Sequence, residues 1–441
     1  MKSIYSKVLF PFFIILSACT PVFQTNQETQ ITNSPTTTNS TPLPPSLITT
    51  PTKQSFHQSK IELITDNAAT GDGGNIWGGH QTRIVHTQDG IFTAYTVEGG
   101  GYLNREWRLV KRQTDGTWLV LAQGESGREP VNLLAAPNGT LYIVGWPGGV
   151  GTLWSGKPSE NKIEMTSEVI PNLPTGNWPY SSAGIDSQGD LCILASNGGE
   201  SERGEFYWSC LQPITNQWTS QVSSLDYRYC YTYVFPAPNG QLSLVSTRDV
   251  RWEALGYQKP ADAFDYVFNA FGYWQTKDIS TQPMTQLSFA EERPTEQYAN
   301  VLLDAQMDAY LDTKGRMHIL YWKMGATTNG ASQSRHRIVS PSGEILFDEE
   351  LPQSAGYYSR IFQDKEENFY LITSSGNLFP MNEDGQITED PITLDLEGNE
   401  VEYSGFGLSV PRTGTPLSNT IDIVFPSGNE HKWLYFQISL P

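Results

Sequence analysis

Short apolar runs alternate with tight turns along most of the chain, and one turn-and-strand phrase recurs. It reads TQDGIFTAYT at its first occurrence and APNGTLYIVG at its second. The copies place seven residues at the turn position: Gly90, Gly139, Gly189, Gly240, Gly315, Glu367 and Asn419. Successive copies lie about 50 residues apart, except for one interval of 75 residues that ends at Gly315. A repeat of this length predicts an all-β fold, a single seven-bladed β-propeller.

Each repeat divides into four strands, named A to D from the central channel outward. In the first repeat the predicted strands are Thr82–His86, Ile91–Thr96, Glu106–Arg112 and Thr117–Gln123. The last repeat lacks a fourth strand, because the chain ends after Trp433–Leu440, which fits strand C. The unassigned N-terminal segment Lys60–Thr65 is therefore expected to pair with 433–440 and to close the ring, which removes two exposed strand edges.

The first residues are typical of an export signal. Lys2 and Lys7 precede an apolar run at 8–16 that is too short to span a bilayer. The run ends in Leu16-Ser17-Ala18-Cys19, which resembles the bacterial lipobox. The resemblance implies cleavage after residue 18 and diacylglyceryl and palmitate groups on Cys19. We therefore expect an extracytoplasmic lipoprotein that is anchored to a bacterial membrane in the cell envelope.

The chain after the signal divides into a tether and a folded part. Residues 19–57 are dominated by Thr, Pro, Asn, Ser and Gln, which predicts a disordered tether, whereas 58–441 carry the propeller. Removing the two lysines of the signal peptide (1–18) changes the formal charge from −19 to −21. This acidic balance argues against nucleic acid and anionic lipid as general partners. We expect a monomer without a cofactor or metal, since metal-ligand spacings and phosphate loops are absent.

Three cysteines remain besides Cys19. Cys192 and Cys210 are equally distant from Ser201, so a symmetric hairpin would place them opposite each other. An exported compartment permits a disulfide between them, which leaves Cys230 as a thiol. The alternative is that all of these thiols are free and buried.

Tryptophans recur on the third predicted strand. Five of them occupy equivalent positions: Trp107, Trp154, Trp208, Trp274 and Trp433. A residue that repeats in nearly every blade is most simply explained by packing between adjacent sheets, so we exclude these five as ligand contacts.

The innermost strands predict a ring of polar side chains. Seven places before the turn of six repeats stand Arg83, Asn132, Ser182, Tyr233, Asp308 and Arg360. Nine places before it stand Gln81, Pro130, Tyr180, Tyr231, Gln306 and Tyr358. Strand periodicity puts both sets on one side, so we expect a small polar ligand or glycan at the channel mouth that carries the D–A and B–C loops. The alternative is that these groups satisfy one another in a water-filled channel.

Two stretches depart from the repeat. The long interval places an insertion between strands B and C of the fourth repeat, with Arg248, Arg251 and Trp252. Such a loop favours a binding role, because arginine and tryptophan offer forked donors and stacking faces to a sugar or carboxylate. The stretch Asp66–Asn75 is interpreted as a flexible connection into the first strand A.

Further candidates precede the A strands. His80 lies beside arginines and tyrosines and is a candidate proton donor or acceptor, although a histidine in a turn is more often structural. Glu129 beside Tyr180 is similar to the activated tyrosine of a glycosidase. Arg128 and Arg228 complete the set of binding candidates.

Over residues 60–441 the repeats resemble the sialidase-like (BNR-type) propeller group, which includes seven-bladed families with polysaccharide lyases. The sialidase box Ser-x-Asp-x-Gly-x-Thr-Trp has its nearest copy at Gln113–Trp118, which occurs once and is one residue short. Sialidases have six blades, and their arginine triad does not map onto this chain.

Three functions are compatible with these patterns. The preferred one is a surface lipoprotein that binds a carbohydrate at the channel mouth through the ring arginines and the Trp252 loop. The second is a lyase or glycosidase that acts on an acidic glycan, in which His80 or a tyrosine takes a proton. The third is a protein-binding platform in the cell envelope.

Overall fold

The computed structural model describes residues 56–441 apart from 71–72, 76, 102, 177–179, 199–202, 260, 262, 293–303, 324–332, 353–357, 402–404 and 428–430. The predicted signal peptide, Cys19 and all but the last two residues of the predicted tether lie outside the described residues. Within the described residues, no helix has the length and apolar character needed to cross a membrane.

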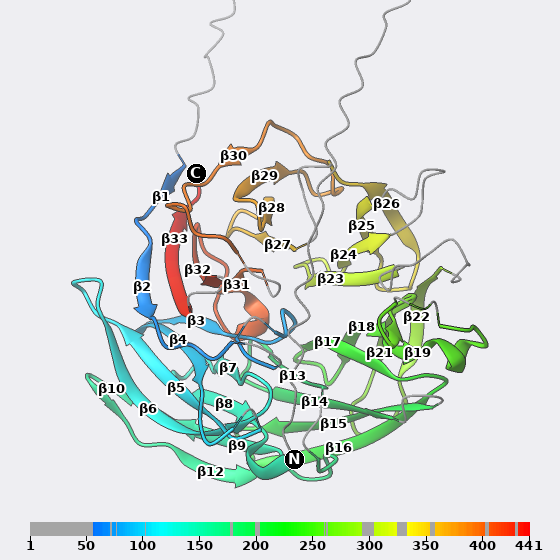
Figure 1. The fold of residues 1–441 in the computed structure, drawn as a ribbon, viewed down its shortest axis with the longest axis horizontal. Coiled ribbons are helices and arrows are strands. Elements are labelled where there is room, and N and C mark those ends of the chain that lie inside the picture. Colours follow the sequence, from blue (N-terminus) through cyan, green and yellow to red (C-terminus); the bar gives the residue numbers. More distant parts are fainter. Residues whose placement is uncertain are drawn as a thin grey trace, which may run out of the picture. The chain divides into compact units, whose positions relative to one another are not determined.

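Seven antiparallel sheets form the blades of a propeller around a central channel, as the repeat predicts (Figure 1). In blade 1 the strands A to D are β3 (Ile84–Thr87), β4 (Gly90–Val97), β5 (Arg105–Arg112) and β6 (Trp118–Gly127). All four predicted strands of this blade are confirmed. The apolar side chains of each strand alternate toward the neighbouring blades, so the core consists of the layers between sheets.

Blades 2 to 6 repeat this order. Blade 2 has β7 (Asn132–Ala135), β8 (Leu141–Gly145), β9 (Thr152–Gly156) and β12 (Thr166–Val169), and blade 3 has β13 (Tyr180–Ile185), β14 (Leu191–Gly198), β15 (Gly204–Gln212) and β16 (Gln217–Leu225). Blade 4 has β17 (Tyr229–Pro236), β18 (Leu242–Arg248), β21 (Ala270–Thr276) and β22 (Thr285–Glu291), and blade 5 has β23 (Asp304–Leu311), β24 (Met317–Lys323), β25 (Gln333–Val339) and β26 (Ile345–Glu350). Blade 6 has β27 (Ser359–Gln363), β28 (Phe369–Thr373), β29 (Asn377–Met381) and β30 (Ile392–Thr393).

The seventh blade is completed by the N-terminal part of the propeller. Its own strands are β31 (Gly407–Leu408), β32 (Thr420–Ser427) and β33 (Lys432–Ser439), and β1 (His57–Gln58) and β2 (Glu62–Thr65) pair with β33. The predicted closure of the ring is therefore confirmed, with Glu62 opposite Tyr435 in an antiparallel register. An ion pair from Glu62 to Arg112 of blade 1, 2.5 Å long, continues the seam into the next sheet.

Smaller elements lie in the connections between strands. They are the hairpin β10 (Pro158–Ser159) and β11 (Lys162–Ile163), the hairpin β19 (Val250–Arg251) and β20 (Tyr266–Val267), and the 3-10 helices η1 (Pro147–Gly149), η2 (Trp252–Leu255) and η4 (Pro411–Thr413).

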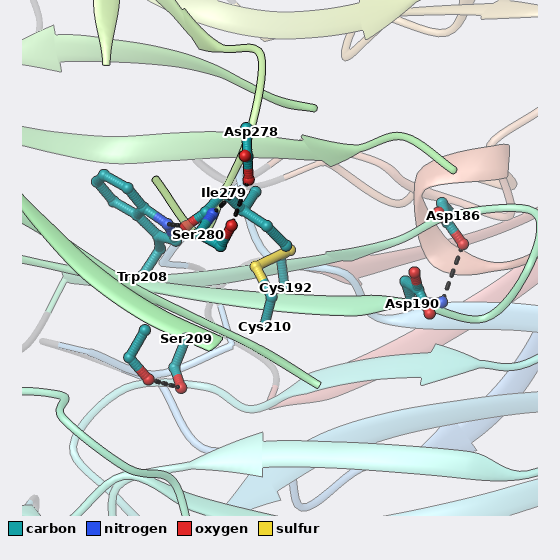
Figure 2. Close-up of a disulfide and its surroundings, with 10 residues drawn as sticks. Asp186, Asp190, Cys192, Trp208, Ser209, Cys210, Asp278, Ile279 and Ser280 are labelled. Carbon is teal, nitrogen blue, oxygen red and sulfur yellow. Dashed lines mark hydrogen bonds between the residues drawn. A yellow bond between two sulfur atoms is a disulfide. The ribbon is translucent and has the colours of Figure 1, made fainter. Parts of the chain in front are cut away.

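The repeated tryptophans pack between sheets, as predicted. Trp107 and Trp154 meet edge to face across blades 1 and 2, with ring centroids 5.5 Å apart. Trp208 is fully buried, and its indole N–H donates to the carbonyl of Ile279 in blade 4 at 3.2 Å (Figure 2). Replacing a buried aromatic of this size by alanine typically costs about 3–5 kcal/mol, so these tryptophans contribute strongly to the packing between blades.

A disulfide joins Cys192 and Cys210 on the neighbouring strands β14 and β15 (Figure 2). The two residues face each other in the register of the hairpin, as its symmetry around Ser201 predicts. Cys230 is a free, buried thiol. The disulfide thus cross-links the two central strands of blade 3, next to the buried indole of Trp208.

Candidate functional site

The predicted polar ring is buried, and its members bond to one another. The guanidinium of Arg360 donates to the hydroxyl of Tyr233 at 2.7 Å and reaches Asp308 at 3.4 Å. The hydroxyl of Tyr233 in turn donates to the carbonyl of Met307 at 2.7 Å. Asn132 accepts the amide N–H of Thr82 at 3.1 Å. Much of the ring is therefore a structural network, which is the arrangement that the alternative interpretation describes.

The connection before β3 covers the channel end at the D–A loops. Arg83 donates to the carbonyls of Asn75, Trp77 and Gly78 and so holds this connection in place. The ring of Trp77 contacts that of Tyr231 in blade 4 edge to face, with centroids 6.0 Å apart. Asn75 is buried and bonds to two main-chain carbonyls. The prediction of a flexible connection over Asp66–Asn75 is wrong, because the described residues of this stretch are fixed by hydrogen bonds.

His80 belongs to this covering segment and is 2% exposed. Its Nε2 lies 3.1 Å from the carbonyl of Ser181, and its ring packs against that of Tyr231. Burial, with the nearby charge of Arg412, lowers the pKa of His80 to about 3. The imidazole is therefore neutral and bonded to the main chain, so a proton-transfer role would require the segment to move.

Glu129 and Tyr180, the other predicted catalytic residues, also contact charged side chains of the protein. Glu129 and Arg128 form a buried ion pair, and the guanidinium of Arg128 lies 5.7 Å from the ring centre of Trp77. Burial raises the pKa of Tyr180, which disfavours the phenolate that an activated tyrosine needs. The guanidinium of Arg228 lies 5.7 Å from the ring centre of Tyr180 and pairs with Asp249 at 2.9 Å.

The insertion of blade 4 forms its own small core. Trp252 is 1% exposed and donates its indole N–H to the carbonyl of Phe264, so its face is unavailable to a sugar in this conformation. Arg251 lies over the ring of Tyr266, and Arg248 pairs with Glu291 at 2.5 Å. These side chains lie apart from the cavity of the channel.

Tyr358 is half-buried just before β27, where its carbonyl accepts the amide N–H of Ser374 at 3.0 Å.

The channel contains a cavity of about 670 Å³. Its inner end is lined by Arg83, Asp308 and Arg360, three members of the predicted ring. From there it reaches the exposed A–B turn residues Ser187 and Thr313. The cavity therefore opens on the side of the A–B turns, opposite to the mouth that we expected from the loop lengths. A volume in this range suits a small-molecule site.

A loop from blade 7 lines one side of this cavity. Residues 409–419 connect β31 to β32, and η4 lies inside the ring of sheets (Figure 1). Arg412 in η4 donates to the carbonyl of His80 at 2.8 Å and approaches that of Ala183 at 3.4 Å. Its guanidinium carbon lies 4.9 Å from the ring centre of Tyr233. The loop thus contacts blades 3 and 4 across the channel.

Arg412 was not among the predicted site residues, although the sequence carries a signal for it. It stands seven places before Asn419, the turn residue of the last repeat, at the same offset as Arg83 and Arg360 in their own repeats. The last repeat has Asn419 instead of glycine at the turn position, which makes this offset hard to recognise. The backbone at Arg412 is a helical turn rather than strand A, so an extended-strand pattern does not include it.

A second pocket of about 460 Å³ lies beside the first, also at the A–B turns. Its wall includes His86, whose Nδ1 lies 2.8 Å from Oδ2 of the buried Asp422. Among the described residues, no three His, Cys, Asp or Glu side chains are grouped to hold a metal ion.

No protein-family model matches the chain, and no curated protein matches its sequence. Among solved structures, the polysaccharide lyase Uly1 aligns with a TM-score of 0.54 at 11% identity, covering 87% of this chain and 99% of the lyase. A protein of unknown function from Dyadobacter fermentans aligns with a TM-score of 0.44 at 9% identity, covering 88% of this chain and 99% of that one. A copper-containing fungal alcohol oxidase of the AA5 family aligns with a TM-score of 0.48 at 10% identity, covering 87% and 76%. At these identities the likeness shows the fold alone, and the chain is a seven-bladed β-propeller.

Proposed function

We propose that this protein is a lipid-anchored, extracytoplasmic binding protein of a bacterial cell envelope, and that its propeller captures a carbohydrate in the channel cavity. One observation carries the proposal. The cavity is large enough for a small molecule, opens on one side and places polar groups at its inner end, below a largely apolar wall. Sugars suit such a site, because their ring faces pack on apolar side chains while their hydroxyls need hydrogen-bond partners.

Binding without turnover fits the state of the predicted catalytic groups. His80 is neutral and held by the main chain, and Glu129 is paired with Arg128. A general base must instead reach the proton that it abstracts and bind it near the working pH. The described cavity wall includes neither His80 nor Tyr180, so the binding role is preferred over a lyase or glycosidase.

The anchoring part of the proposal rests on Leu16–Cys19 and on the tether that follows. Metabolic labelling with a fatty-acid analogue in a bacterial host tests it. We expect label on the intact chain and none on the Cys19→Ala variant, with the variant released from the membrane fraction. Labelling that persists in Cys19→Ala would contradict the lipid anchor.

The carbohydrate part is tested with a soluble form that begins after Cys19. A glycan array is followed by titration calorimetry of each hit and by assays for new reducing ends and for the absorbance of unsaturated uronates. Binding without products is the expected result. Products would favour the lyase or glycosidase alternative, and the absence of any glycan hit would overturn the carbohydrate proposal and direct attention to protein partners.

A further inference from the structure

Three guanidinium groups gather at the inner end of the cavity, from blades 1, 6 and 7. Arg83 donates to three main-chain carbonyls of the covering segment. Arg360 donates to the carbonyls of Phe406 and Met307, each at 2.8 Å. Arg412 is half-buried in the cavity wall. Carbonyls accept several of the N–H groups of these arginines, but they do not neutralise the charges.

The carboxylates near these three arginines already have hydrogen-bond or ion-pair partners. Asp308 pairs with Arg360 at 3.4 Å and also accepts the amide N–H of Ile361 at 2.9 Å. Glu129 is paired with Arg128. Asp312 lies at the outer end of the cavity and is bound by Arg316 at 2.7 Å. The second carboxylate of the outer end, Asp186, accepts two amide N–H groups of its own turn. The inner end therefore carries more positive than negative charge.

Buried charge without a counter-charge is unfavourable, and it lowers the pKa of two of the three arginines, Arg83 and Arg412. Burial and the neighbouring charge of Arg360 lower the pKa of Arg83 to about 9. Burial lowers the pKa of Arg412 to about 10, although Tyr233 and Asp308 favour its charged form. An anion at this position would relieve the repulsion among the three groups.

Arg412 is the arginine best placed to receive that anion. Its contacts are two carbonyls and the faces of Tyr233 and Phe235. Among the described residues, no carboxylate forms an ion pair with it. A guanidinium offers parallel N–H donors that match the two oxygens of a carboxylate, which a compact ammonium group does not.

We propose that the carbohydrate held in the cavity is a uronic acid, and that Arg412 binds its carboxylate. This inference rests on the proposed carbohydrate function and specifies its ligand. Three other residues of the cavity wall, Gln81, Asp186 and Gln363, each retain one buried acceptor oxygen without a partner among the described residues.

The test compares acidic sugars with their neutral parents. Calorimetric titrations use glucuronate against glucose and galacturonate against galactose, together with a sulfated galactose, on the full soluble domain. We expect each uronate to bind at least about tenfold more tightly than its parent, since a hydrogen bond between two charged groups is stronger than one between neutral groups. Arg412→Gln should remove that preference, and Arg412→Lys should restore only part of it.

Arg203→Gln is the matched control, because Arg203 is exposed on the blade 3 hairpin and lies outside the cavity wall. It should leave every affinity unchanged. Retained binding of neutral sugars by Arg412→Gln would show that the cavity is still folded.

The two proposals can fail separately. Equal affinities for uronates and neutral sugars, or a preference that survives in Arg412→Gln, would overturn the role of Arg412 while the carbohydrate function stands. Tighter binding of the sulfated sugar than of the uronates would overturn the carboxylate assignment. If none of the sugars binds, both proposals fall.

Discussion

Nδ1 of His86 lies 2.8 Å from Oδ2 of Asp422 and joins strand A of blade 1 to strand B of blade 7. The carboxylate is fully buried and also accepts from the hydroxyl of Tyr435 at 2.7 Å and from the side-chain amide of Gln437 at 2.9 Å. The pair therefore connects blades 7 and 1, between which the ring closes. His86 is its more exposed member and is the group whose protonation changes near neutral pH.

The first prediction concerns the pH dependence of this seam. The hydrogen bond that Nδ1 of His86 donates to Asp422, together with the negative charge of that carboxylate, raises the pKa of His86. A raised folded-state pKa adds stability that is fully present below the unfolded pKa of about 6.5 and is lost as the pH rises through the folded value. The side chain of His86 is 38% exposed, so the effect is small.

We expect His86→Gln to lower the free energy of unfolding by about 1 kcal/mol or less at pH near 5.5, and by less above pH near 8. Urea unfolding at both pH values measures it, and a loss that grows with pH would contradict the pairing.

The second prediction concerns ring closure. Deleting residues 57–65 removes both strands that cover β33 and the ion pair from Glu62 to Arg112. We expect loss of more than about 3 kcal/mol in one cooperative transition, because the outer edge of β33 becomes exposed and blade 7 loses the Glu62–Arg112 link to blade 1. Deleting nine residues from the tether at 30–38 is the control of equal length. Thermal unfolding that is the same for both deletions would contradict the closure.

Local pattern and repeat length were sufficient to predict the scaffold. The turn glycines predicted the blades, and the symmetry around Ser201 predicted which residue faces Cys192. Both depend on residues that are close in sequence or that recur in each blade, so one chain contains the information. The closing strand followed from the strand count alone.

The cavity depends on loops that no repeat describes. The side on which the channel is closed depends on how 66–81 and 409–419 fold back across it, and these contacts join residues more than 200 positions apart, such as Arg412 and Ala183. Counting offsets identified Arg83 and Arg360 in the wall, but not whether their donors were free or bonded to the main chain. Hydrogen bonds between an arginine and the main chain of a distant segment form only in the folded protein, so a local sequence pattern does not predict them.

The third prediction concerns the disulfide. In a soluble form without Cys19, denatured protein should show one reactive thiol, from Cys230, and three after reduction. The bridge closes a loop between residues 18 positions apart, so replacing Cys192 and Cys210 by serine should lower the free energy of unfolding by about 2–3 kcal/mol. Cys230→Ala should leave no thiol before reduction. Three reactive thiols in the unreduced protein would show that the bond is not formed.

The last prediction concerns the loop that carries Arg412 into the channel. Gly414 adopts a φ of 90°, and a Cβ there would lie 1.8 Å from the carbonyl oxygen of Ala135. Gly414→Ala must therefore displace the loop, and we expect it to lower the free energy of unfolding by about 2 kcal/mol. It should also expose the Arg412–Thr413 bond to trypsin, whereas we expect this bond to be protected in the wild-type protein. Gly240→Ala is the matched control, because Gly240 has a φ of 78° and open space within 4 Å, so that only the backbone strain of about 1 kcal/mol remains. Equal losses of unfolding free energy in the two variants, with the bond after Arg412 still protected from trypsin, would mean that the loop is not packed tightly against blade 2.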